Sequence, residues 1–151
     1  MTAPATTAGR LSVVKYSTTA AAFASATDIS SSVDSETFEH IVDQMDVTTF
    51  GNTSHVRAVT LMDTKFDLTG FYNPTLEAAM ITAQQASVSA AYGATTPVTW
   101  YYAPQGVGSG LPLYTLTAWI TSVTADAKAT DITAMKIGLT VTGDLTAGTQ
   151  A

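Results

Sequence analysis

A regular alternation of apolar and polar residues that ends at an Asn-Pro pair constrains the fold of this chain more than any other feature. Between Lys65 and Tyr72, every second residue is apolar or glycine, namely Phe66, Leu68, Gly70 and Tyr72. A period of two places these residues on one face of a β-strand and the polar residues on the other. The stretch therefore predicts a strand with one buried face.

A helix is expected directly after this strand. Asn73 is a favoured N-cap residue, and Pro74 suits the first helical position because its missing N–H is not needed there. The apolar residues that follow recur at helical spacing, which predicts a helix to about Ala86 with a buried core stripe that includes Leu76 and Met80.

The residues before the strand predict a β-hairpin. Val56–Leu61 is apolar and rich in β-branched residues. Met62-Asp63-Thr64 lies between this run and the strand, and we expect the chain to turn there. The turn lacks the glycine that the tightest hairpin types favour.

The C-terminal third also has the pattern of β-structure. Residues 98–102, 113–123 and 134–141 have strand-like patterns, and Gln105 to Gly110 lie in a loop rich in glycine and proline. Together, these elements predict a mainly β fold: an antiparallel β-sandwich or barrel with one α-helix. We expect residues 1–151 to form a single domain, in which residues 1–10 are a flexible N-terminal arm.

Residues 36–45 give conflicting signals. Phe38, Ile41, Val42 and Met45 recur at the spacing of one helix face, so periodicity alone predicts a helix.

Charge and composition limit the classes of function. The formal net charge is −6, with only six Lys plus Arg, which argues against a surface that grips nucleic acid. Charged residues make up 12% of the chain, against the usual ~25%, so much of the surface is suited to contact with other subunits. There is no cysteine, no basic and apolar leader, and no apolar run long enough to cross a membrane, so we expect a soluble, cytosolically made product with no membrane binding.

The sequence contains only weak signals for a chemical site. His40 lies among acidic residues, but neighbouring strand residues point to opposite faces, so a solvated polar face explains this cluster better than a metal site. His55 and the serines do not include a nucleophile elbow, and "GVGSG" at residues 106–110 lacks the ending of a phosphate-binding loop. The sequence therefore predicts no catalytic residue, cofactor or metal.

Three segments together resemble a known family. They are "TDISSSV" at residues 27–33, "DVTTFGNT" at 46–53 and "AVTLMDTKFDLTGFYNPT" at 58–75, and the end of the chain adds "LTVTGDLT" at 139–146. In order and spacing they resemble the tail tube proteins, or major tail proteins, of bacteriophages with long non-contractile tails. The resemblance also implies that residues 36–45 form a strand.

The resemblance implies a structural virion protein and not an enzyme. Its expected partners are copies of itself, in homohexameric rings stacked into a tube, together with a tape measure protein, a tail terminator and baseplate or tip proteins. DNA would pass through the lumen without specific binding. The expected location is the virion tail, assembled in the host cytoplasm. A capsid decoration protein or another virion binding module is the alternative.

The same resemblance implies roles for particular residues. The strands from Phe38 to Thr48 and Val56 to Tyr72 would line the inner wall, with Asp63 and Asp67 facing the lumen. Contacts between rings would come from Arg10 in the N-terminal segment and from Gln105 and Val107 in the glycine-rich loop. The helix would pack outside the sheet.

Overall fold

The computed structural model describes residues 11–51, 53–89, 96–127, 129, 131 and 133–151. Over these residues the chain forms seven strands, one α-helix and two short 3-10 helices. The strands are β1 (Val13–Ser17), β2 (Thr27–Asp28), β3 (Val33–Asp46), β4 (Arg57–Phe71), β5 (Val98–Ala103), β6 (Pro112–Asp126) and β7 (Ala134–Thr149). The helices are α1 (Pro74–Ser89), η2 (Phe23–Ser25) and η3 (Ser30–Ser32).

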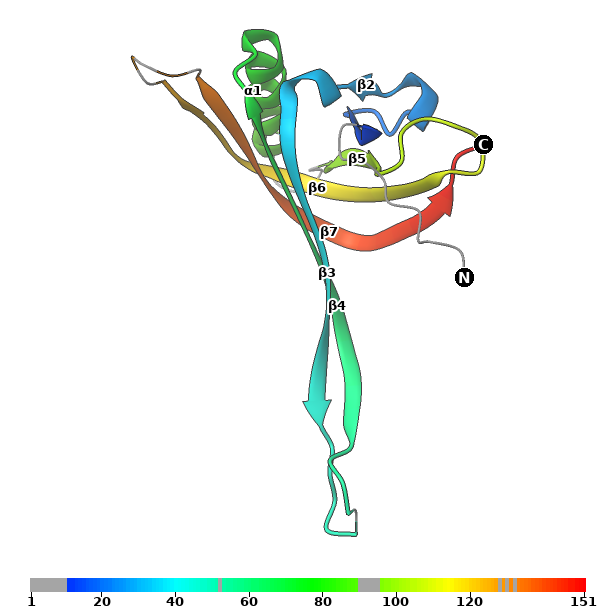
Figure 1. The fold of residues 1–151 in the computed structure, drawn as a ribbon. Helices are drawn as coiled ribbons and strands as arrows, with labels where there is room; N and C mark the ends of the chain where they lie inside the picture. Colours follow the sequence, from blue (N-terminus) through cyan, green and yellow to red (C-terminus); the bar gives the residue numbers. More distant parts are fainter. Residues whose placement is uncertain (1–10, 52, 90–95, 128, 130, 132) are drawn as a thin grey trace.

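The described strands form one antiparallel sheet in the order β2-β1-β5-β6-β7-β4-β3. In Figure 1, β6 and β7 curve through the middle of the molecule, α1 lies above them, and β3 and β4 run downward past them. The predicted mainly β, antiparallel fold with one helix is confirmed.

The hydrophobic core lies on one face of this rolled sheet. Two strands, β6 and β7, separate β4 from β5 in the strand order. Even so, the ring of Phe66 on β4 lies 6.3 Å from Trp100 and 5.8 Å from Tyr102 on β5, measured between ring centroids. Only a sheet that curves back on itself brings these rings together, and the inward residues of all its long strands share one interior.

Helix α1 covers one opening of this interior. Its start is capped as the sequence predicts, because Asn73 Oδ1 accepts hydrogen bonds from the backbone N–H of Thr75 at 3.0 Å and of Leu76 at 3.2 Å. Leu76 and Met80 are buried in the core, and the helix lies against β6. At the other end, Gln84 Nε2 donates to the carbonyl of Thr121 at 3.2 Å and ties the helix to that strand.

The predicted turn at Met62-Asp63-Thr64 is wrong. Strand β4 passes through these residues without a break, and Asp63 pairs with Ile41 on β3. The hairpin partner of Lys65–Tyr72 is therefore β3, and the chain reverses over residues 47–56 instead. The physical reason is that residues 62–64 contain no turn-forming glycine, whereas Gly51 lies in the true connection.

Residues 36–45 are part of a strand, as the family resemblance implies, although their spacing fits a helix. In β3, Phe38 pairs with Phe66 and turns toward the core, where its ring also lies 5.1 Å from that of Tyr114. Pairing along the whole of β4 outweighs the local helical pattern.

The sheet divides where β4 leaves β7. These strands pair only from Asp67 with Gly138 to Phe71 with Ala134. Before Asp67, β4 keeps β3 as its partner and runs away from β7, so β3 and β4 continue as a two-stranded ribbon (Figure 1).

Gly70 lies very close to the backbone of η3. A Cβ at this position would lie 1.8 Å from the carbonyl oxygen of Ser32, in the η3 turn that packs on β4. We predict that Gly70→Ala forces these two backbones apart and lowers the free energy of unfolding by about 1–3 kcal/mol or more. Urea unfolding followed by circular dichroism measures the change.

Gly148→Ala is the matched control, because a Cβ there meets nothing within 4 Å and the position is also in a strand. Equal unfolding midpoints for the two variants would show that the Ser32–Gly70 contact does not constrain the fold.

Candidate assembly surface

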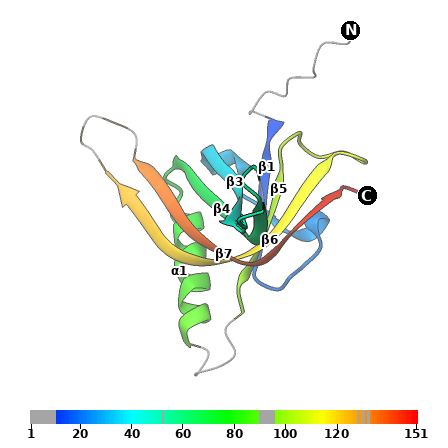
Figure 2. The same cartoon turned by 90° about the horizontal axis from the view of Figure 1, so that it is seen from below.

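The most unusual surface of the molecule is the ribbon formed by residues 41–63, which comprises the outer parts of β3 and β4 and their connection. It projects from the body as two strands with no third strand beside them (Figure 1). Figure 2 looks along the ribbon from below and shows the body of the sheet spread around its base. From Ile41 to the end of β3 at Asp46, the paired part of the ribbon extends roughly 17 Å at about 3.3 Å per residue.

The ribbon carries an exposed apolar surface. Phe50 is 111% exposed, Leu61 is 72% exposed and Met62 is 70% exposed. Leu61 and Met62 are adjacent in a strand, so both faces of the ribbon are apolar. Its other large exposed apolar residues are Met45, Val47, Val56 and Val59.

Such a surface requires a partner. An isolated two-stranded ribbon is marginally stable in water, and contiguous exposed apolar patches mark sites of protein association. The ribbon is therefore suited to lie against another protein surface.

The connection at the end of the ribbon is held by one carboxylate. Asp46 accepts hydrogen bonds from the Thr48 backbone N–H at 2.9 Å and from the Thr48 hydroxyl, and its Oδ2 lies 3.0 Å from Nδ1 of His55. Thr48 Oγ1 in turn accepts from the backbone N–H of Val56 at 2.9 Å. The Thr48 hydroxyl, then its backbone N–H and then His55 hold the pKa of Asp46 below its ordinary value. These bonds link the two sides of the connection beside Phe50.

Unpaired strand edges add a second kind of assembly surface. Within the described part of the chain, β3 pairs with β4 alone, and residues 139–149 of β7 pair with β6 alone. Edge strands of this length present backbone N–H and C=O groups that can pair with another chain. The sheet can therefore be extended by strands of neighbouring molecules.

The two predicted lumen residues lie on the face of β4 that points away from the core. Thr64, Phe66 and Leu68 are buried, so the alternating residues Asp63 and Asp67 are on the opposite face. On this face Lys65 Nζ also lies 3.9 Å from Glu39 Oε2 of β3, at exposed positions.

The glycine-rich loop is fixed by Gln150, which sequence reasoning did not single out. Its buried side chain accepts from the Gly108 N–H at 3.0 Å and donates to the Gly106 carbonyl at 2.7 Å. The loop presents Val107, which is 65% exposed, and the exposed Gln105. Arg10, the third predicted contact residue, lies outside the described residues.

The histidine noted among acidic residues lies beside a threonine of the neighbouring strand. His40 Nδ1 lies 2.9 Å from the Thr64 hydroxyl, and no group of three or more His, Asp or Glu residues there is arranged to hold a metal ion. Within that same part of the chain, no helix is long and apolar enough to span a membrane.

Comparison of the sequence with models of protein families and with curated proteins found no match. Comparison of the structure found similar chains in phage-like particles. The tail of an empty gene transfer agent particle, with C6 symmetry, has a chain with a TM-score of 0.66 and 12% identity, over 97% of this chain and 100% of that one.

Two similar chains come from other particles. One is in the tube-terminating cap of the anti-feeding prophage, with a TM-score of 0.68, 11% identity and coverage of 99% and 95%. The other is in the sheath-tube complex of an extracellular contractile injection system, with a TM-score of 0.66, 14% identity and coverage of 96% and 93%. The fold is therefore tail-tube-like.

We predict that Asp46→Ala opens the connection of the ribbon and increases proteolytic cleavage within residues 47–56 several-fold at pH 7. The pKa of Asp46 is lower in the folded protein than in the unfolded chain. The stability that ionised Asp46 contributes is therefore present above the unfolded pKa of about 3.9, and it is lost as the pH falls through the lower folded pKa. The protection of the Thr48 amide, measured as its exchange rate relative to the unfolded chain at the same pH, should therefore fall in acid in the natural protein. Asp43→Ala is the control at an exposed position of the same strand, and equal cleavage of the two variants would contradict the prediction.

Proposed function

We propose that the protein is the structural subunit of a viral tail tube. Six copies form a ring, and the rings stack into a hollow tube that belongs to a long non-contractile tail. The observation that carries this proposal is the ribbon, whose apolar residues on both faces have no partner within the described part of the subunit.

Unpaired strand edges support the ring. The free edge of β3 on one copy can pair with the free edge of another, and a closed ring leaves no edge exposed. The gene transfer agent tail that contains a chain of the same fold has C6 symmetry. The low charge of the chain suits extensive contact between neutral surfaces.

The tube has several other partners in this proposal. The tape measure protein occupies the lumen during assembly, tail terminator and baseplate or tip proteins close the two ends, and DNA later passes through without specific binding. The subunit functions in the virion tail and is assembled in the host cytoplasm. The net charge of −6 favours passage of DNA, because an acidic wall does not hold phosphate groups.

A non-contractile tail has no sheath around its tube. One chain of the same fold comes from a sheath-tube complex, so the absence of a sheath needs its own test. Electron micrographs of particles that contain this protein test this part directly. A tail of a single thin tube supports the non-contractile assignment, whereas an outer layer around the tube contradicts it and leaves the tube role intact.

The assembly role is tested on the ribbon. We predict that the purified protein forms rings or tubes at high concentration and that the double variant Leu61→Thr, Met62→Thr does not. Threonine keeps the strand propensity, but each lost apolar contact removes about 1.5–3 kcal/mol. Two such losses per subunit should raise the concentration needed for assembly more than tenfold, measured by light scattering and negative-stain microscopy.

Phe71→Thr is the control, because Phe71 is also an exposed apolar residue of β4 but lies outside the ribbon. Assembly of the double variant at the natural concentration would remove the ribbon from the interface. A natural protein that stays monomeric at millimolar concentration, even with tube fragments added as seeds, would refute the tube role.

The lumen assignment is tested by charge reversal. We predict that tubes with Asp63→Lys and Asp67→Lys assemble but deliver DNA poorly, because a ring of positive charge holds phosphates by counterion release. Infectivity per assembled particle is the measurement. Normal infectivity would place both residues away from the lumen.

A further inference from the structure

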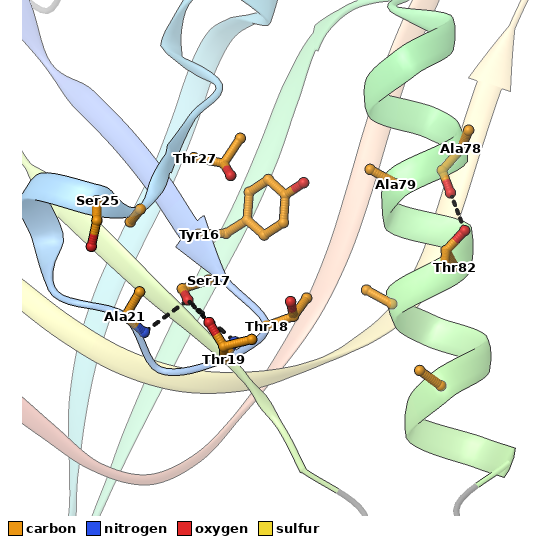
Figure 3. A pocket seen from close by; sticks show the side chains of 13 residues that line it. Tyr16, Ser17, Thr18, Thr19, Ala21, Ser25, Thr27, Ala78, Ala79 and Thr82 are labelled. Atoms are coloured by element: carbon orange, nitrogen blue, oxygen red, sulfur yellow. Dashed lines mark hydrogen bonds between the residues drawn. The ribbon is translucent and has the colours of Figure 1, made fainter.

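A groove lies beside α1, at the end of the molecule opposite the ribbon. It has a volume of about 550 Å³ and lies between the helix and the segment that follows β1. Figure 3 shows Ala79 on the helix pointing toward Tyr16 across the opening. The groove is also lined by Ala78 and Thr82 of the helix and by Ser17 and Thr18 of the facing segment. Both walls belong to elements that lie at the top of Figure 1, whereas the ribbon points downward.

The lining of this groove consists of small, uncharged side chains: six alanines and six serine or threonine residues, together with Tyr16. Two of the hydroxyl groups bond to backbone within the groove walls: Ser17 Oγ accepts from the Ala21 N–H at 2.9 Å, and the Thr82 hydroxyl donates to the Ala78 carbonyl at 2.8 Å. None of the lining residues is charged. The groove therefore suits an apolar side chain and offers nothing to bind an ion.

The ribbon carries a surface that matches the groove, because it is also uncharged and exposes an apolar side chain. Residues 47–54 of the connection carry no ionisable side chain, and Phe50 within them is 111% exposed. Docking two neutral surfaces removes no charge from water, so the interface bears no cost of charge desolvation. A volume of about 550 Å³ lies within the ~300–1,000 Å³ range of sites that enclose small molecules, so an aromatic ring and its neighbours fit.

We propose that the groove beside α1 receives Phe50 from the ribbon of a second copy of this chain. The contact joins different surfaces on the two copies, and these surfaces lie at opposite ends of the subunit. A repeated contact of this kind stacks subunits in one direction without closing on itself. The proposal rests on the tube function and identifies the partner of the ribbon as the next ring.

Cysteine trapping tests the contact, because the natural chain contains no cysteine. Gly51→Cys places a thiol beside Phe50, where a Cβ meets no other atom within 4 Å. Thr82→Cys places the second thiol in the groove. The two variant proteins are mixed, allowed to assemble under mild oxidation, and digested for mass spectrometry, so that a disulfide between positions 51 and 82 can come only from two different copies.

We expect the 51–82 disulfide to be at least tenfold more abundant than the disulfide between position 51 and either of two control cysteines. Gln85→Cys is exposed on the same helix outside the groove. Thr149→Cys lies in the other apolar depression, which is lined by Phe23, Val107 and Leu113. Equal yields, a preference for position 149, or mainly 51–51 disulfides would overturn the proposal.

A groove-filling variant gives a second readout. Thr82→Trp should raise the concentration needed for assembly at least tenfold, whereas Gln85→Trp should not change it. Tubes that form without the 51–82 disulfide refute the groove contact alone. If the 51–82 disulfide forms only in small complexes that never become tubes, the groove contact is supported and the tube role is refuted. If neither the disulfide nor tubes form, the groove contact and the tube role are both refuted.

Discussion

The fold depends on the short junction between β4 and β7. Five residue pairs, from Asp67–Gly138 to Phe71–Ala134, join the ribbon strands to the rest of the sheet. The junction needs two glycines because its neighbours come unusually close: a Cβ at Gly70 would meet the Ser32 carbonyl, and one at Gly138 would lie 2.4 Å from Ser122 Oγ. Ser122 follows an irregularity in the pairing of β6 with β7. The junction that holds the ribbon to the body therefore includes a close backbone contact at Gly70 and a close side-chain contact at Gly138, far from the apolar residues that the ribbon presents.

Local signals predicted the elements but not how they pair. The alternation from Phe66 to Gly70 and the cap at Asn73 depend on neighbours in sequence, and both are present in the structure. The turn expected at Met62-Asp63-Thr64 failed because an apolar run followed by an alternating run also describes one long strand. The strand at residues 36–45 required the family resemblance, since its apolar spacing matches a helix and only pairing with β4 shows otherwise.

The candidate surface was harder to predict than the fold. Leu61 and Leu68 are the same residue type in the same strand, yet the first is 72% exposed and the second is buried. A sequence without its tertiary structure cannot separate them, because apolar residues at an interface and in a core obey the same local pattern. Alternation did place Asp67 on the face away from the core, whereas Asp63 was expected in a turn and instead lies within β4. Gln150 and the groove beside α1 gave no usable signal, because each depends on segments distant in the chain.

The absence of charge from residues 47–54 affects how a particle built on this surface would respond to its surroundings. Contacts between charged groups weaken as salt rises, because ions screen them within about 10 Å at 0.1 M. Apolar contacts are not screened, but their driving force near room temperature is entropic and weakens on cooling. Joints formed by Phe50 and its apolar neighbours would therefore tolerate wide changes in ionic strength and would loosen in the cold.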